Sequence, residues 1–408
     1  MAKKIEKTPL NKKGWVANFT LVGEAKVGDY TFSLDNHSEK SDWIYNRMSL
    51  GVNCGEKSGD VFAELMGGYG SERGDKNVIY VHGKKEDGSD DFENSYTIHW
   101  DDRFEEDILA DIGDLCFLTV GLEKDVKDKT VYKKFLSAYD AIAYMQEHLE
   151  EGMVVNVKGQ LKYSVYNDVV QCKKEINSVV LSSATPDKYR ASFTQTILLD
   201  KDSCTKDSVN KDKSVLEIYA YVTEKFKEFN GYDLTDGGKN KGGLVVPLKK
   251  TFEYDIDLTK GDMVQKIMNK VFKVKKGVTQ ITFEGEFVES GAAVTATMDD
   301  VPDDIKELIE IGMYTEEEAL AKCSENGNKE RRMILTRPVF RMVGDDDNKV
   351  PQILREDEKY TDDDLLLDCL TKKEEGEEEE DEVPFVEEDA DDDASDDEDP
   401  MAWLNNLD

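Results

Sequence analysis

The sequence lacks closely spaced pairs of metal ligands. Its six cysteines lie at least 32 residues apart, so no CxxC pair exists, and its four histidines show no ligand spacing. A structural zinc site needs such pairs, so we expect no bound metal. Scattered cysteines are typical of free thiols in a reducing compartment.

Long apolar runs are also missing. No stretch of the chain is long enough to form a membrane-spanning helix, and no apolar segment follows Met1-Ala2-Lys3-Lys4. We therefore expect no signal peptide, no membrane partner and a cytoplasmic location.

The common catalytic motifs are absent. The sequence contains no GxxxxGK[ST], no HExxH and no GxSxG. Aspartate clusters at 299–300, 303–304 and 345–347 could hold a divalent cation, but such clusters in loops are more typical of a solvated surface. We expect neither an enzyme nor a cofactor, with a metal-dependent nuclease as the enzymatic alternative.

Positive charge is scarce overall. The formal net charge is −36, and residues 374–408 contain 19 Asp and Glu without any Lys or Arg. Residues 1–373 still carry −17. Any surface that binds an anionic partner must therefore be a local patch.

The first half of the chain alternates apolar and polar residues, as β-strands do. We predict a helix over residues 132–150, where apolar residues recur at helical spacing until Gly152. Residues 84–130 show no clear pattern and resemble a charged insertion. The predicted strands are 15–22, 42–52, 61–66, 78–81, 153–164 and 169–181.

A second pass of the same pattern begins near Tyr189. Strand-like stretches at 215–222, 244–248 and 251–256 precede a helix over 262–273 and a strand over 278–288. In both halves a glycine, Gly159 or Gly285, lies seven or eight residues after the glycine that ends the helix. Residues 302–325 look like a helical insertion before a last strand over 331–343, where Pro338 suits an edge or a bulge.

Three or more strands, a helix and two further strands is the order of an OB-fold barrel. We therefore predict a mainly β protein with inserted helices, built of tandem OB-fold-like barrels, although any β-rich domain with one helix would share this order. The predicted parts are a flexible basic arm at 1–13, domains at 14–185 and 186–371, and an acidic tail at 372–408.

The tail is too polar to form a core, so we predict that it is disordered. Its acidic run is interrupted by Val383, Pro384 and Phe385, and Trp403 and Leu404 lie near its end. An acidic segment with a few apolar residues is typical of a docking peptide. Its charge guides the encounter with a partner protein, and its apolar side chains fill a pocket on that partner.

This arrangement resembles the single-stranded DNA-binding proteins of bacteria and their phages. Their OB-folds precede an acidic tail that closes on Ile-Pro-Phe, to which Val383-Pro384-Phe385 is similar but internal. The resemblance implies a protein that coats single-stranded DNA in replication, recombination or repair and recruits other proteins of these processes through its tail. It also implies the host cytoplasm if the chain is phage-encoded.

Single strands are held by cations that contact phosphates and by aromatic rings that stack on bases. Residues 239–276 form the most basic region, with ten lysines and four acids. The candidate DNA-binding residues are Trp43, Tyr45, Arg47, Lys158, Lys162, Tyr163, Tyr166, Lys239, Lys241, Lys249, Lys250, Phe252 and Tyr254.

Two non-enzymatic alternatives stay open. The acidic body also fits a scaffold of a phage replication complex, or a decoy whose surface mimics DNA. Salt separates these classes, because binding to DNA weakens as salt rises, whereas a decoy does not bind DNA.

Overall fold

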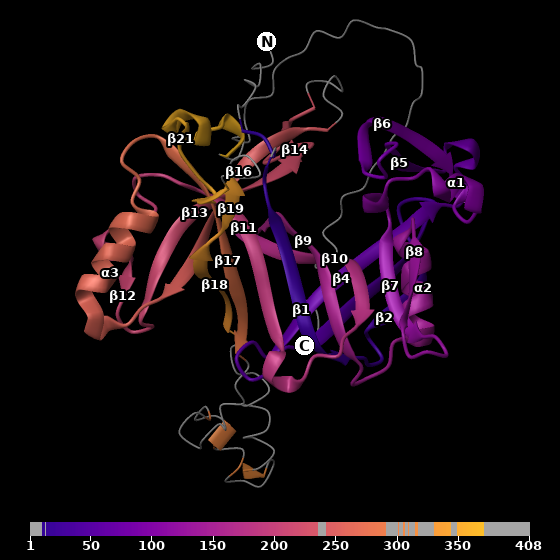
Figure 1. The fold of residues 1–408 in the computed structure, drawn as a ribbon, viewed down its shortest axis with the longest axis horizontal. Helices are drawn as coiled ribbons and strands as arrows, with labels where there is room; N and C mark the ends of the chain where they lie inside the picture. Colours follow the sequence, from indigo (N-terminus) through magenta and orange to yellow (C-terminus); the bar gives the residue numbers. More distant parts are fainter. Residues whose placement is uncertain are drawn as a thin grey trace, which may run out of the picture.

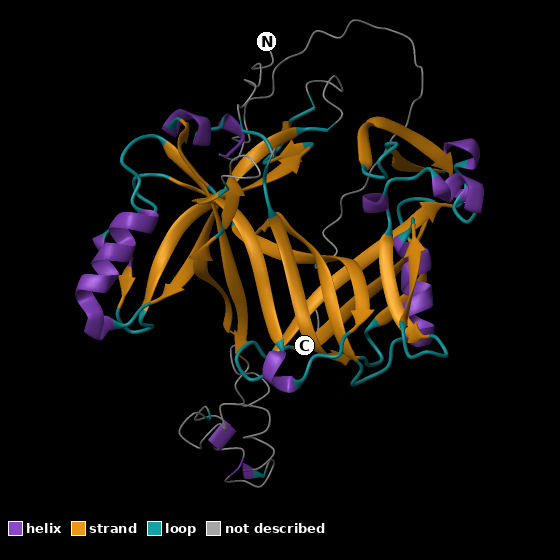
Figure 2. Ribbon diagram, in the orientation of Figure 1, coloured by secondary structure: helices purple, strands orange, loops and turns teal. Residues whose placement is uncertain are grey.

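The computed structural model describes residues 10–12, 14–235, 242–290, 330–343 and 349–370, with a few isolated positions between 301 and 316. Strands dominate the molecule, and the helices lie at its ends and along its rims (Figure 2). The prediction of a mainly β protein with inserted helices is confirmed. Among the described residues, no helix is both long and apolar enough to cross a bilayer.

The first half contains a closed five-stranded barrel. β1 pairs with β3, β3 with β4, and β9 with both β10 and β1, all antiparallel, while β10 and β4 are parallel and close the ring. The predicted barrel is thus present. Its strands are β1 (Ala17–Lys26), β3 (Trp43–Asn53), β4 (Asp60–Gly70), β9 (Val154–Tyr166) and β10 (Val169–Leu181).

The helix α2 (Ala138–His148) lies between β4 and β9 in the chain and packs Ala141, Ile142 and Met145 into the barrel core. The prediction that this helix begins at residue 132 was wrong. Residues 130–135 instead form β8 (Thr130–Phe135), which pairs with β7 (Leu118–Lys124). The helix begins after Ser137, whose hydroxyl accepts a hydrogen bond from the Tyr139 backbone N–H at 3.1 Å.

Additional elements surround this barrel. β2 (Phe32–His37) pairs with the outer edge of β3. Residues 71–117 form an insert with a small core of its own around Val81, Ile98 and Ile112. The insert contains β5 (Val78–Lys84), β6 (Asp90–His99) and α1 (Glu106–Ala110), and it lies at one end of the long axis of the molecule (Figure 1).

The second half repeats the order of strand pairings. β11 pairs with β13, β13 with β16, β16 in parallel with β18, β18 with β17, and β17 with β11. The helix α3 (Gly261–Ile267), as predicted, follows β16 and buries Val264. The strands are β11 (Arg190–Leu199), β13 (Val215–Phe226), β16 (Leu244–Asp255), β17 (Val278–Ser290) and β18 (Glu330–Pro338).

The predicted last strand divides after Pro338, where β18 ends and β19 begins at Phe340. Most of the predicted helical insertion at 302–325 lies outside the described residues. The remaining strands are β12 (Val209–Asn210), β14 (Glu228–Phe229), β15 (Tyr232–Asp233), β19 (Phe340–Val343), β20 (Val350–Ile353) and β21 (Arg355–Tyr360).

The two halves join through the antiparallel pairing of β1 with β11, in which Phe19 lies opposite Phe193. One continuous core cluster includes residues of both halves, and the Tyr163 hydroxyl donates a hydrogen bond to Gln195 at 2.8 Å. The described part of the N-terminal arm packs on the second half, where Leu10 is buried against Leu198 and Lys12 forms an ion pair with Glu224. The halves therefore form one packed body.

The two glycines singled out in the sequence occupy equivalent crowded positions. A Cβ on Gly159 would lie 1.8 Å from the Glu175 carbonyl oxygen and 2.7 Å from the Phe19 ring. A Cβ on Gly285 would lie 2.2 Å from the Phe193 ring and 2.6 Å from the Ile334 carbonyl oxygen. Only glycine allows each central strand to lie so close to its neighbour.

Gly159→Ala should lower the free energy of unfolding by about 3 kcal/mol, because the backbone carbonyl it meets cannot move aside. Gly28→Ala is the matched control, since its Cβ would enter open space. It should change stability by less than about 0.5 kcal/mol. Chemical denaturation measures both, and equal stabilities would contradict the described barrel.

Candidate nucleic-acid interface

The outer face of β3 carries three of the predicted DNA-binding residues. Met48 and Leu50 point into the barrel, so the alternate residues Trp43, Tyr45 and Arg47 share the opposite face, where each is half-buried. The Trp43 and Tyr45 rings stack with centroids 4.6 Å apart and planes 15° apart. The structure therefore brings these residues together as one surface.

Strand β4 leaves room for this aromatic pair. Gly70 lies opposite Trp43 and Gly68 lies opposite Tyr45. A Cβ on Gly68 would meet the Tyr45 Cβ at 2.7 Å, so Tyr45 lies directly over a bare stretch of backbone. The Arg73 side chain covers Gly70, with its Nε 2.2 Å from where a Cβ would lie, so the bare backbone beside the rings is that of Gly68.

Two apolar side chains that the sequence reasoning missed continue the same face. Met66 lies opposite Arg47 and is 39% exposed, and Phe62 lies opposite Gly51 and is 42% exposed. The alternation of residues 61–66 could have revealed them, since Val61, Ala63 and Leu65 are buried. Together Trp43, Tyr45, Arg47, Phe62 and Met66 form what we call the β3–β4 face.

The second half presents a similar combination on the outer face of β13 and β16. Tyr219 is 47% exposed opposite Thr251, and Tyr221 lies opposite the exposed Lys249. The Lys249 ammonium is 5.9 Å from the centre of the Tyr221 ring. These residues line a hollow of about 340 Å³, and we call them the β13–β16 face. The sequence reasoning found Lys249 but missed both tyrosines, although the strand alternates clearly.

Acidic groups accompany the β13–β16 face. The Tyr221 hydroxyl donates to Asp200 at 3.1 Å, and the Tyr219 hydroxyl donates to Glu217 at 2.7 Å. Burial and the Asp200 charge raise the pKa of Tyr221. Both tyrosines are therefore neutral near pH 7, and their rings are held in fixed orientations.

Lys250 points to the other side of β16, toward the junction of the halves. Burial lowers the pKa of Lys250, and the neighbouring Lys174 of β10 lowers it further. Lys174 in turn lies over the Phe287 ring, with its ammonium 4.6 Å from the ring centre. Two cations of different halves thus approach each other where solvent is limited.

Two predicted base-stacking residues belong to the core instead. Phe252 is fully buried, and Tyr163 is 3% exposed. The prediction took neighbouring lysines as a sign of exposure, but strand alternation turns Phe252 inward while Lys249 points outward. Tyr254 is half-buried and packs edge-on against Phe272 at 5.5 Å.

The lysines of β9 lie on its outer side. Lys158 is exposed, and the half-buried Lys162 lies directly opposite Lys173 of β10. Like charges directly opposite each other on neighbouring strands are destabilising. Tyr166 is half-buried at the turn into β10.

The other predicted residues lie outside the described residues. They are Lys239 and Lys241, and the tail residues Val383, Pro384, Phe385, Trp403 and Leu404.

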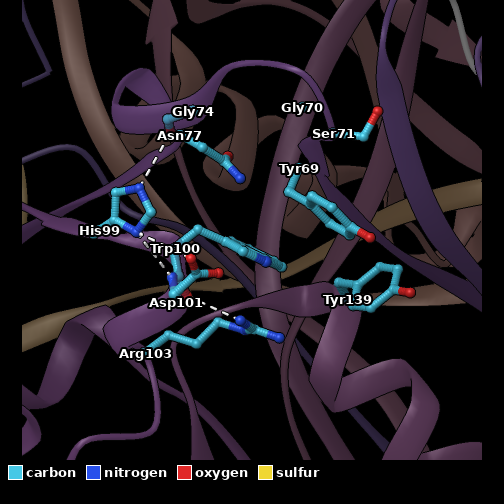
Figure 3. Close-up of a pocket in the computed structure, with 10 residues that line it drawn as sticks. All are labelled: Tyr69, Gly70, Ser71, Gly74, Asn77, His99, Trp100, Asp101, Arg103 and Tyr139. Carbon is cyan, nitrogen blue, oxygen red and sulfur yellow. Dashed lines mark hydrogen bonds and ion pairs between the residues drawn. The ribbon is translucent and has the colours of Figure 1, made fainter.

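An aromatic pocket of about 450 Å³ lies where β4 enters the insert (Figure 3). Trp100 stacks on Tyr69 at 4.8 Å, and the Arg103 guanidinium lies 4.1 Å from the centre of the Trp100 ring. Arg103 also pairs with Asp140 at 2.7 Å. Each of these groups already has a partner, whereas the Asn77 side-chain amide forms no hydrogen bond with the described residues.

The pocket adjoins the β3–β4 face at the end of β4. Gly70 and Ser71 line it, and Gly70 pairs with Trp43. Tyr69 lies on the opposite side of β4 from the bare glycine under Tyr45. The pocket and the β3–β4 face therefore lie on opposite sides of β4 and meet only at its end, at Gly70 and Ser71.

The described residues contain no group of three or more His, Cys, Asp or Glu side chains arranged to hold a metal ion. No protein-family model and no curated protein matches the sequence.

Lys250→Met should raise the free energy of unfolding at pH 7 by roughly 1 kcal/mol, because it removes a charge from a confined position beside Lys174. The folded-state pKa of Lys250 lies below its usual 10.5. The wild-type protein therefore recovers stability as pH rises through that folded pKa toward 10.5. Thermal unfolding should therefore show that the difference in stability between the wild type and Lys250→Met becomes smaller as pH rises over this range. The exposed control Lys249→Met should differ little from the wild type at any pH.

Proposed function

We propose that this protein binds single-stranded DNA without sequence preference, on two OB-fold-like domains in tandem at 14–185 and 186–371. The order β1, β3, β4, α2, β9, β10 and the parallel pairing of β4 with β10 support the first domain. The repeated pairings around β11 and β13 support the second.

One observation carries the proposal. The stacked Trp43–Tyr45 pair and Arg47 lie on the outer face of the second and third barrel strands. OB-folds bind oligonucleotides on this face. Tyr219, Tyr221 and Lys249 occupy the corresponding strands of the second half, so each half offers aromatic rings for bases and a cation for phosphate.

The route of the strand follows from these positions. Bases stack on the β3–β4 face, and the strand then turns around the end of β4, so that one base enters the pocket beside Asn77, where the amide can donate to and accept from a base edge. The exposed Lys158 and the half-buried Lys162 of β9 supply further cations for phosphates.

The acidic tail at 372–408 serves the same function in a different way. It recruits proteins of replication or recombination, and it competes with DNA for the few cationic positions when DNA is absent. Neither role requires a catalytic step or a cofactor.

Fluorescence anisotropy of labelled oligo-dT, with duplex DNA as the comparison, tests the proposal. We expect preference for the single strand and an affinity that falls with salt, with a log–log slope of roughly −2 to −4 for three to five neutralised phosphates. Absence of binding to either DNA would favour the scaffold or decoy, and metal-dependent degradation of the probe would reveal a nuclease.

Trp43→Ala and Tyr45→Ala should each weaken binding to oligo-dT by about 5- to 150-fold, since one stacked base contributes about 1–3 kcal/mol. Tyr30→Ala is the matched control, because Tyr30 is 90% exposed and lies off the β3–β4 face. It should bind like the wild type. Equal losses in all three variants would remove the basis for this site.

Removal of residues 374–408 should tighten binding to oligo-dT at low salt, because it removes 19 competing negative charges. The gain should shrink as salt rises and screens the tail. The same titration on the shortened chain measures it, and weaker binding would contradict competition by the tail.

A further inference from the structure

The insert presents an acidic surface with exposed aromatic side chains. Residues 71–117 contain 14 Asp and Glu and five Lys and Arg. Tyr80, Phe92 and Phe104 are 83%, 66% and 59% exposed. Charged residues alone are common on surfaces, but large exposed rings among them are typical of a contact surface.

The opposite end of the molecule has the complementary character. Residues 258–276, which include α3, contain six lysines and one acidic residue. Lys266, Lys270, Lys273 and Lys275 are exposed and form no ion pair with the described residues. Leu258 and Met263 beside them are 42% and 58% exposed.

The positions of these two surfaces exclude contact within one molecule. The insert lies at one end of the long axis and α3 at the other, with the β1–β11 seam between them (Figure 1). Lys266 lies on α3, Lys270 on the helical turn that follows it, and Lys273 and Lys275 just beyond, at the end of the molecule that α3 occupies in Figure 1.

We propose that the insert of one copy of this chain docks on the α3 surface of the next copy, so that copies assemble head to tail along a single strand. The inference rests on the proposed function for the role of DNA, but the contact itself is between proteins. A head-to-tail contact uses two different surfaces and leaves both ends open for further copies. Its charges attract, and its apolar side chains become buried.

The contact is weak in free solution, because exposed ion pairs contribute little and salt screens them. DNA binding raises the local concentration of neighbouring copies and makes the same contact effective. The protein should therefore bind long strands cooperatively. It should bind short strands, which hold only one copy, without cooperativity.

Charge reversal tests the contact. One variant carries Glu105→Lys, Glu106→Lys and Asp107→Lys in the insert, and the other carries Lys266→Glu, Lys270→Glu and Lys273→Glu. Each should keep its affinity for a one-copy oligo-dT within about two-fold and lose about 10-fold or more in cooperativity on long oligo-dT. Reversal at Asp187 and Lys188, outside both surfaces, is the control.

Combination of the two sets in one chain restores opposite charges, so the six-fold variant should regain cooperativity. An equal mixture of the two single-set variants should regain it as well, through alternating copies. If neither sample regains cooperativity on long oligo-dT, the proposal is wrong. It is also wrong if the lysine variant loses as much affinity for the one-copy oligo-dT as it loses in cooperativity.

Sedimentation velocity of the full chain without DNA at low salt separates this proposal from the proposed function. Wild type and the six-fold variant should self-associate at high concentration, and the two single-set variants should not. A monomeric wild type that also binds long DNA without cooperativity overturns the contact. The lysine variant should also be compared with the wild type after residues 374–408 are removed from both. If the two shortened proteins then behave alike, the acidic tail and not the insert binds the α3 surface, and the proposal is wrong.

Discussion

The pairing of β1 with β11 is the constraint on which the rest of the structure depends. It sets Phe19 opposite Phe193, and each ring lies against a glycine of a central strand, Gly159 or Gly285. Any side chain at those glycines would push the strand away from its phenylalanine. The seam thus fixes the orientation of the two halves, and with it the relation between the β3–β4 face and the β13–β16 face.

The acidic composition has a different consequence in each part of the molecule. Lys12, Arg103 and Arg332 pair with carboxylates and help to hold the fold together. The cations left near the aromatic faces are few, so stacking contributes more to the proposed DNA binding than phosphate contacts do. Exposed acidic residues of the insert and exposed lysines around α3 lie at opposite ends of the long axis, which favours contact between copies.

Sequence pattern predicted much of the fold, because apolar alternation depends on local burial. It located β10, α3 and the outward-facing Trp43, Tyr45 and Arg47. It placed the start of α2 too early, since Tyr132 and Phe135 fit a helical stripe as well as a strand and only pairing with β7 decides between them. Phe252 and Tyr163 were misplaced because lysines close to them in sequence were taken as a sign of exposure, whereas successive residues of a strand face opposite sides. The Trp100 pocket could not be predicted, since its residues come from three separate segments.

The central claim is that single-stranded DNA lies on the β3–β4 face. Photo-crosslinking of the full chain to oligo-dT, followed by peptide mapping, tests this claim most directly. The account predicts crosslinks at Trp43 or Tyr45 on β3, together with Tyr219 or Tyr221 on β13, and their loss when unlabelled oligo-dT competes. Crosslinks confined to other segments, with β3 and β13 unmodified, would contradict it.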